Sequence, residues 1–182
     1  MTLTTVAGGM WLNAPVGHAS AAPGVPNATI DASAEKYAMI IRCPRSGDLE
    51  TCEFRIGTVG NNPDNGLRIS FQNIDASGDP DGTQDQFRTI TGPFSSNSWV
   101  TPGILSSDGT DGGIKRTVVA GDRLAVVIEF ESFVAADSVT FGALSATSSS
   151  ASIEATEHYV GQFIASWSKL LHSGVLALKY VN

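Results

Sequence analysis

Residues 122–133, DRLAVVIEFESF, decide the fold class because apolar side chains occupy every second position. One face of an extended strand would carry Leu124, Val126, Ile128 and Phe130. Glu129 and Glu131 would lie on the opposite face. A strand with one apolar and one polar face is typical of a sheet that is half buried. The stretch therefore predicts a strand that packs against a core.

The same alternation recurs in both directions along the chain. Four further stretches show it, namely residues 37–43, 51–59, 67–74 and 139–145, and residues 174–182 end the chain with it. Clusters of Gly, Asn, Asp, Pro and Ser separate these stretches, such as VGNNPDNG and SSDGTDGG. Short strands with such turns predict an all-β fold, namely an antiparallel, jelly-roll-like sandwich of eight or nine strands.

The two cysteines lie in CPRSGDLETC, where eight residues separate Cys43 from Cys52. We interpret the segment as a hairpin with the turn PRSGD, which places the thiols on adjacent strands. The spacing differs from the close pairs of a zinc site. A disulfide remains an open alternative if the chain meets an oxidising medium.

Residues 157–172 allow two interpretations. Val160, Phe163, Ile164, Trp167, Leu170 and Leu171 recur at intervals of three and four, which indicates a helix. Gly161, Ser166 and Ser168 weaken that signal, so an extended strand is the alternative.

Residues 1–32 differ in composition from the rest. Pro15, Pro23 and Pro26 accompany many Gly and Ala residues, which favours an extended N-terminal arm without regular strands. Residues 33–182 would form the sandwich domain. Met10 and Trp11 suggest an arm that docks on its own domain or on a neighbouring chain. No Lys or Arg precedes a continuous apolar run here, so we expect no secretory signal.

The charge balance excludes some partners. The chain of 182 residues has 18 acidic and 11 basic side chains, a net charge of −7, without any basic cluster. Nucleic-acid binding needs clustered positive charge, so it is not expected. No apolar run is long enough for a membrane helix, so membrane insertion is not expected either.

An acidic stretch follows the strand pattern of residues 67–74. Asp75, Asp79 and Asp81 lie within DASGDPDGT, where Gly82 takes the place of the turn glycine of a calcium loop. The two ends of such a loop would be Ser77 and Arg88, which do not fit the motif. We interpret the stretch as a turn between strands, with a weak ion site at the three aspartates as the alternative.

The remaining patterns do not indicate catalysis. The Gly-rich stretch 106–116 lacks the phosphate-loop order and is interpreted as a turn. Glu129 and Glu131 alternate with core residues and would face solvent, unlike a glycosidase pair. There is no GxSxG motif, and His18, His158 and His172 are scattered. We expect no enzymatic activity, no catalytic residue and no cofactor.

Two tryptophans could stack on sugar rings. Trp99 lies in NSWV and Trp167 in ASWSK, both in or near strand patterns. An indole on the outer face of a sandwich binds carbohydrate by stacking, whereas an indole on the inner face belongs to the core. Both interpretations stay open at this point.

Several of these segments together resemble a family. YAMIIRCPRSGDLETCEFRIGTV, LRISFQNIDASGDPDGT and SSDGTDGGIKRTVVAGDRLAVVIEF are similar to a β-sandwich module of the structural proteins of tailed bacteriophages, over about residues 33–145. The resemblance implies a non-enzymatic virion protein, either a capsid decoration or a tail-fibre component. It also implies contacts with other virion proteins and with further copies of the chain, as a homo-oligomer for which a trimer is the expected form. The alternative function is a carbohydrate-binding module for host-surface glycans.

Overall fold

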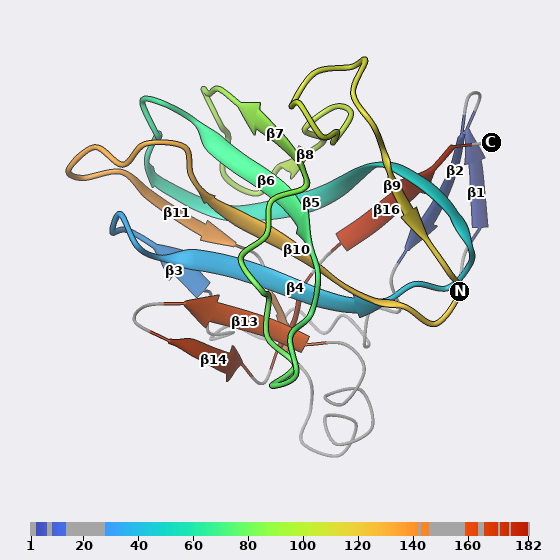
Figure 1. Ribbon diagram of the computed structural model, residues 1–182. Helices are drawn as coiled ribbons and strands as arrows, with labels where there is room; N and C mark the ends of the chain where they lie inside the picture. The colour runs from blue at the N-terminus through green and yellow to red at the C-terminus, as the bar shows by residue number, and fades with distance from the viewer. Residues whose placement is uncertain are drawn as a thin grey trace.

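The protein is an all-β structure throughout the residues that the computed structural model describes (Figure 1). These are residues 3–6, 9–13, 28–141, 143–145, 159–163, 166–170, 172–174 and 176–181. In chain order the strands are β1 (Leu3–Val6), β2 (Gly9–Asn13), β3 (Ala28–Ile30), β4 (Lys36–Arg42), β5 (Gly47–Asn61), β6 (Leu67–Gln72), β7 (Gln86–Ile90), β8 (Trp99–Val100), β9 (Arg116–Val118), β10 (Arg123–Phe130), β11 (Ser138–Phe141), β12 (Ala143–Ser145), β13 (Tyr159–Phe163), β14 (Trp167–Leu170), β15 (His172–Gly174) and β16 (Leu176–Tyr180).

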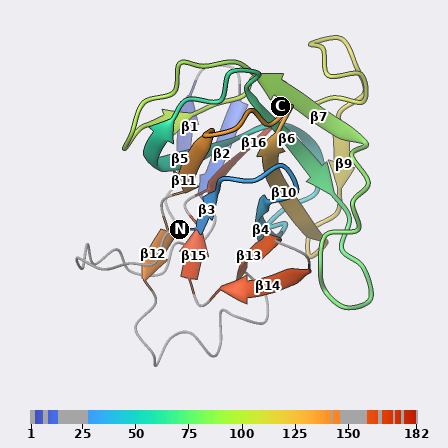
Figure 2. The same cartoon turned by 90° about the vertical axis from the view of Figure 1, so that its left-hand side faces the viewer.

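Two antiparallel sheets form the body of the protein, and Figure 2 shows them as two layers. One has the order β1-β2-β16-β5-β11-β3, with β8 and β9 also paired to β5. The other has the order β14-β13-β4-β10-β6-β7, and β12 and β15 pair separately. The sequence prediction of an all-β antiparallel sandwich is confirmed.

A single large core fills the space between these sheets. Leu124, Val126, Ile128 and Phe130 of β10 all belong to it, with exposures of 7% or less. Facing them, β5 contributes Leu49, Cys52, Phe54 and Ile56. The predicted inner faces of residues 67–74 and 122–133 are therefore correct, because alternation sends every second side chain into the same layer.

One aromatic pair joins the two sheets directly. Tyr37 of β4 stacks on Phe141 of β11, with ring centroids 4.5 Å apart and an angle of 13° between the planes. Phe54 of β5 lies at 6.1 Å from Phe141 in a tilted arrangement. All three side chains are at most 1% exposed. The Phe141 ring thus connects β11 to β5 within its own sheet and to β4 in the other sheet.

The expected hairpin between residues 37–43 and 51–59 is wrong. Both strands exist, but β4 pairs with β10 and β13, whereas β5 pairs with β8, β9, β11 and β16. The connection around PRSGD therefore crosses from one sheet to the other. Cys43 and Cys52 are free, buried thiols within the core and not cross-strand neighbours of a hairpin. Period-two alternation predicts a strand but not its partner.

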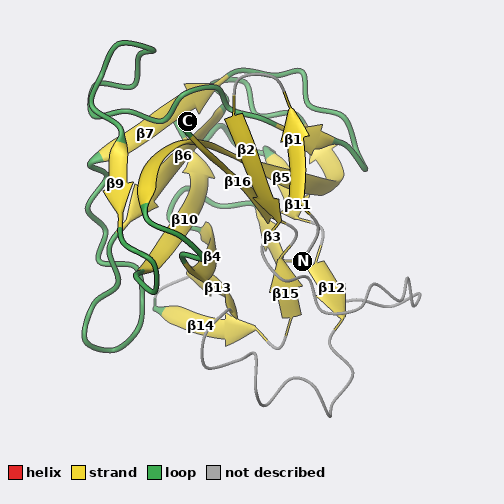
Figure 3. Cartoon of the chain, turned by 90° about the vertical axis from the view of Figure 1, so that its right-hand side faces the viewer, coloured by secondary structure: helices red, strands yellow, loops and turns green. Residues whose placement is uncertain are grey.

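The expectation that residues 1–32 lack regular strands is also wrong. β2 pairs with β16, and β1 continues the sheet beyond β2 (Figure 3). β3 pairs with β11, and Ala28 and Ile30 are buried in the core. The three prolines fall between β2 and β3 in the sequence, so they interrupt neither strand.

Within the ambiguous residues 157–172, the described residues form strands except for a bend at Ser166. β13 pairs with β4 on one side and with β14 on the other, which extends the sheet of β10. The helical spacing of apolar residues in this stretch did not decide the structure, because hydrogen bonding to the edge of β4 satisfies the backbone in extended form.

The outer face of the sheet that contains β10 is covered as well. Ala38, Ile40, Ala125 and Val127 form a second small apolar cluster, and Ile74 packs against it. Ile74 belongs to the connection between β6 and β7, which Figure 1 shows running across β10 and β4. The backbone N–H of Gly82 in that connection donates to Oε1 of the buried Gln72 at 3.1 Å. This connection, residues 73–85, acts as a cover over the sheet.

Replacing the ring that joins the layers tests the packing. We expect Phe141→Ala to lower the free energy of unfolding by about 3 to 5 kcal/mol, because the change removes apolar contacts from both sheets and leaves a cavity. Urea unfolding followed by far-ultraviolet circular dichroism measures the loss. Val119→Ala is the control, since Val119 is 60% exposed and should change stability by less than about 0.5 kcal/mol. Equal effects of the two changes would contradict the packing described.

The thiols supply a second test of the core. Burial raises the pKa of Cys43 to about 11 and raises that of Cys52 further. Thiolate is the reactive form, so both cysteines should react with a disulfide reagent at pH 8 only when urea unfolds the chain. Absorbance of the released thiol counts the reacting groups. Two thiols that react at once in native buffer would contradict their burial, and none in urea would indicate a disulfide.

Candidate functional site

The outer face of the β10 sheet carries a network of charged side chains that includes both glutamates singled out in the sequence. Oε2 of Glu129 lies 2.6 Å from Nζ of Lys36, and Nε2 of Gln84 donates to its other oxygen. The Glu129 side chain is only 14% exposed, which is less than expected for a solvent-facing residue. Its burial follows from Gln84, because that residue belongs to the cover over the sheet.

Glu131 is held by a fork-shaped pair of bonds. Nε and Nη2 of Arg68 donate to its two carboxylate oxygens at 2.6 and 2.7 Å, and Oγ1 of Thr89 donates at 2.7 Å. The hydrogen bonds from Arg68 hold the pKa of Glu131 below its usual value. Arg68 also donates to Oε1 of Gln84 at 3.0 Å. Both carboxylates therefore help to hold neighbouring strands and the cover of residues 73–85 together, which is a structural role.

The acidic stretch forms a turn, as predicted. Oδ1 of Asp75 accepts the backbone N–H of Ser77 at 2.8 Å and that of Asp79 at 2.9 Å. Oδ1 of Asp81 accepts the N–H of Thr83 at 2.9 Å. Gly82 has a φ of 84°, a conformation that glycine adopts without strain. Aspartates that bond to the backbone two residues ahead are typical of Asx-turns.

The alternative of an ion site at Asp75, Asp79 and Asp81 has no support from the arrangement of side chains. Among the described residues, no group of three or more His, Cys, Asp or Glu side chains is placed so as to hold a metal ion. Oδ1 of Asp75 already accepts two backbone N–H groups.

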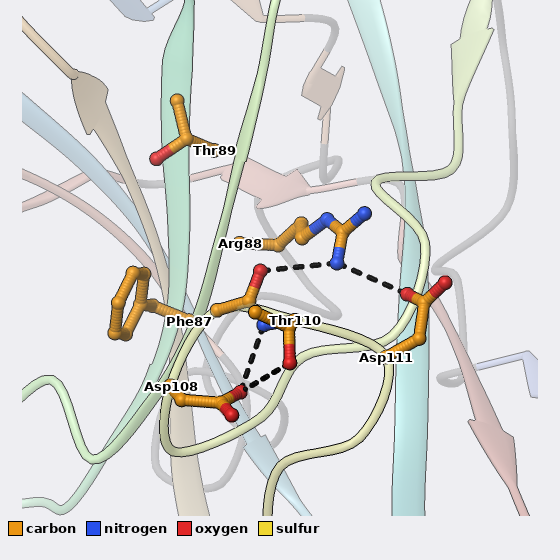
Figure 4. A pocket seen from close by; sticks show the side chains of 7 residues that line it. Phe87, Arg88, Thr89, Asp108, Thr110 and Asp111 are labelled. Atoms are coloured by element: carbon orange, nitrogen blue, oxygen red, sulfur yellow. Dashed lines mark hydrogen bonds and ion pairs between the residues drawn. The ribbon is translucent and has the colours of Figure 1, made fainter.

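A shallow, open depression of about 440 Å³ lies where the loop after Ser106 meets β7 (Figure 4). Phe87, Arg88, Thr89, Asp108, Gly109, Thr110 and Asp111 line it. Nη1 of Arg88 donates to the carbonyl oxygen of Gly109 and to Oδ1 of Asp111, each at 3.0 Å. Oδ1 of Asp108 accepts the backbone N–H of Thr110 at 2.9 Å, and this bond contributes most to the lowered pKa of Asp108. The predicted turn in residues 106–116 is confirmed by these contacts.

The Phe87 ring at this depression already contacts two other parts of the protein. The guanidinium of Arg68 lies 4.8 Å from the centre of the Phe87 ring. A Cβ atom at Gly109 would approach Cε2 of Phe87 to 2.7 Å, so the loop backbone packs against the same ring. The depression therefore lies where the loop after Ser106 packs against β7. Sequence reasoning did not find it, because Phe87 and Asp108 come together only through tertiary pairing of Phe87 with Ser106.

The tryptophans and Met10 that the sequence singled out as candidate contact residues lie on three different strands. Trp99 lies on β8 and is 49% exposed, so it is a surface residue and the core interpretation is wrong for it. Trp167 lies on β14, and Met10 and Trp11 lie on β2, but the contacts of their side chains fall outside what the structure describes. His18 and His158 also fall outside the described residues, and His172 lies on β15. No described contact brings any of these residues to the glutamate network.

Comparisons with known proteins add no family. Neither the protein-family models nor the curated proteins nor the solved structures include a match to this chain. In the part of the chain that the structure describes, no helix has the length and apolar character needed to cross a membrane.

The forked bond to Glu131 predicts a pH-dependent effect. The pKa of Glu131 is lower in the folded chain than in the unfolded chain, where it is near 4.5. The hydrogen bonds from Arg68 therefore stabilise the fold above that pH. This stabilisation is lost as the pH falls through the lower pKa of the folded chain. Glu131→Gln should therefore lower the free energy of unfolding by about 1 kcal/mol at pH 7, and by less as the pH approaches 3.

Urea unfolding at a series of pH values measures this difference. Asp64→Asn is the control, because Asp64 is exposed in the turn between β5 and β6. A loss for Glu131→Gln that is the same at pH 3 and pH 7 would contradict a stabilising role for the ionised carboxylate.

Proposed function

We propose that the protein is a non-enzymatic structural protein of a bacteriophage virion that acts through contacts with further copies of itself and with other virion proteins. One observation carries the non-enzymatic part. The carboxylates of Glu129, Glu131, Asp75 and Asp108 all accept hydrogen bonds from the protein's own strands and loops. These four carboxylates hold the strands and loops of the sandwich together, which supports a structural role for them.

The assembly part rests on the edge of the larger sheet. β1 is the first strand in its order and pairs with β2 alone among the described strands. The outer edge of such a strand presents backbone N–H and C=O groups, which pair readily with a strand of another chain. A second copy of the chain is the occupant we propose, as the resemblance to fibre and decoration modules suggests. β1 would then be the assembly element of the N-terminal segment, next to Met10 and Trp11 on β2.

Removing β1 tests assembly with little disturbance of the core. In the intact chain β2 pairs with β16, and Ala28 and Ile30 lie in the core. A chain that lacks residues 1–6 should keep both features. We expect the intact chain to be a defined oligomer by light scattering and the shortened chain to be a monomer with an unchanged circular dichroism spectrum. An intact chain that stays monomeric up to about millimolar concentration would contradict this function.

A carbohydrate-binding module is the second candidate function, and the exposure of Trp99 favours it. An indole that is 49% exposed on a paired strand offers a flat apolar surface on which a sugar ring can stack. This function is compatible with the first, since a virion protein can also bind host-surface glycans.

A further inference from the structure

Trp99 is held in its exposed position by the strands around it. The backbone N–H of Ile56 donates to the carbonyl oxygen of Ser98 at 2.9 Å, and the N–H of Asn97 donates to that of Gly57 at 2.8 Å. Val100, the next residue, packs against the core. Alternation therefore directs the indole away from the core, and Trp99 is the exposed aromatic residue among the described side chains. Its exposure is a product of strand geometry.

A cation lies directly beside it. Arg55 of β5 is the register partner of Trp99, so the two side chains share the outer face of the sheet. The contact of Arg55 within the described part of the chain is a long hydrogen bond of 3.4 Å from Nη2 to Oδ1 of Asn97. By contrast, Arg68 and Lys179 each have a carboxylate within 3.0 Å. Arg55 thus forms no ion pair with a described residue, in a chain whose net charge is −7.

Polar groups continue this surface along the two strands. Glu53 lies two residues before Arg55 on β5, and Oγ1 of Thr101, two residues after Trp99, donates to its Oε1 at 3.3 Å. With the Asn97 amide, these groups offer hydrogen-bond donors and acceptors around the indole. The depression at Phe87 does not include Trp99, which lies on β8 beside β5 in the other sheet.

We propose that Trp99 and Arg55 form a binding site for an acidic glycan, with a sugar ring on the indole and its carboxylate on the guanidinium. This proposal rests on the second candidate function and names its site and its ligand class. A guanidinium can bind a carboxylate through two parallel hydrogen bonds, and Arg55 forms no ion pair with a described residue that would compete for it. Glu53, Thr101 and Asn97 offer acceptors and donors that suit sugar hydroxyls.

Calorimetric titration of the full chain tests the proposal with two classes of probe. The acidic probes are tetrasaccharides that contain glucuronic, galacturonic or sialic acid, and the neutral probe is the tetramer of N-acetylglucosamine. We expect at least one acidic probe to bind about tenfold more tightly than the neutral one, because a charge-assisted pair adds to the stacking. Raising the salt concentration should reduce that preference.

Two substitutions separate the contributions. Trp99→Ala should abolish binding of every probe, whereas Arg55→Gln should reduce the acidic preference to about parity and retain the stacking. Val119→Ala, another exposed position, is the control. The urea midpoint of each variant should match that of the wild type, which shows that the fold is intact.

Three results would overturn the proposal. Glycan binding that survives in Trp99→Ala would place the site elsewhere and leave the second candidate function standing. Equal affinity of the wild type for acidic and neutral probes would exclude the role of Arg55. No binding of any probe would reject both the site and the carbohydrate-binding function. The oligomeric mass is measured separately, so none of these results bears on assembly.

Discussion

The structure depends on the burial of two facing layers of apolar side chains between its sheets. Tyr37 and Phe141 stack directly across this core, because each ring belongs to a different sheet. Once the inner faces are fixed, alternation fixes the outer faces too. The positions of Glu129, Glu131 and Trp99 on the outer faces of the sheets are therefore consequences of core packing.

The outer faces of the two sheets have different characters. On the β10 sheet the carboxylates, Arg68 and Gln84 bond to one another and hold the cover of residues 73–85 in place. On the β5 sheet, Trp99 is exposed and Arg55 has no ion partner among the described residues. Buried or paired polar groups are consistent with a structural role, whereas an exposed indole beside a guanidinium that forms no ion pair with a described residue is consistent with binding. We therefore assign a structural role to the outer face of the β10 sheet and the proposed ligand site to the outer face of the β5 sheet.

Sequence reasoning predicted the strands better than their partners. Period-two alternation located β4, β5, β6, β10, β11 and β16 and the inward residues of β6 and β10, because alternation is a local property. The connection of β4 to the other sheet and the pairing of β2 with β16 depend on contacts distant in sequence, which no local pattern encodes. The same limit explains the site. Trp99 could be named as a candidate from its residue type, but its exposure and its neighbour Arg55 follow only from the register of β8 on β5.

We propose that the outer edge of β1, which pairs with β2 alone among the described strands, pairs with a second copy of the chain. Hydrogen exchange of the backbone amides at two protein concentrations tests this claim most directly. If the claim is right, amides of residues 3–6 gain protection as the concentration rises, while those of β10 stay equally protected at both. If residues 3–6 exchange at the same rate at both concentrations, although the chain is oligomeric at the higher one, the copies associate through another surface and the claim is wrong.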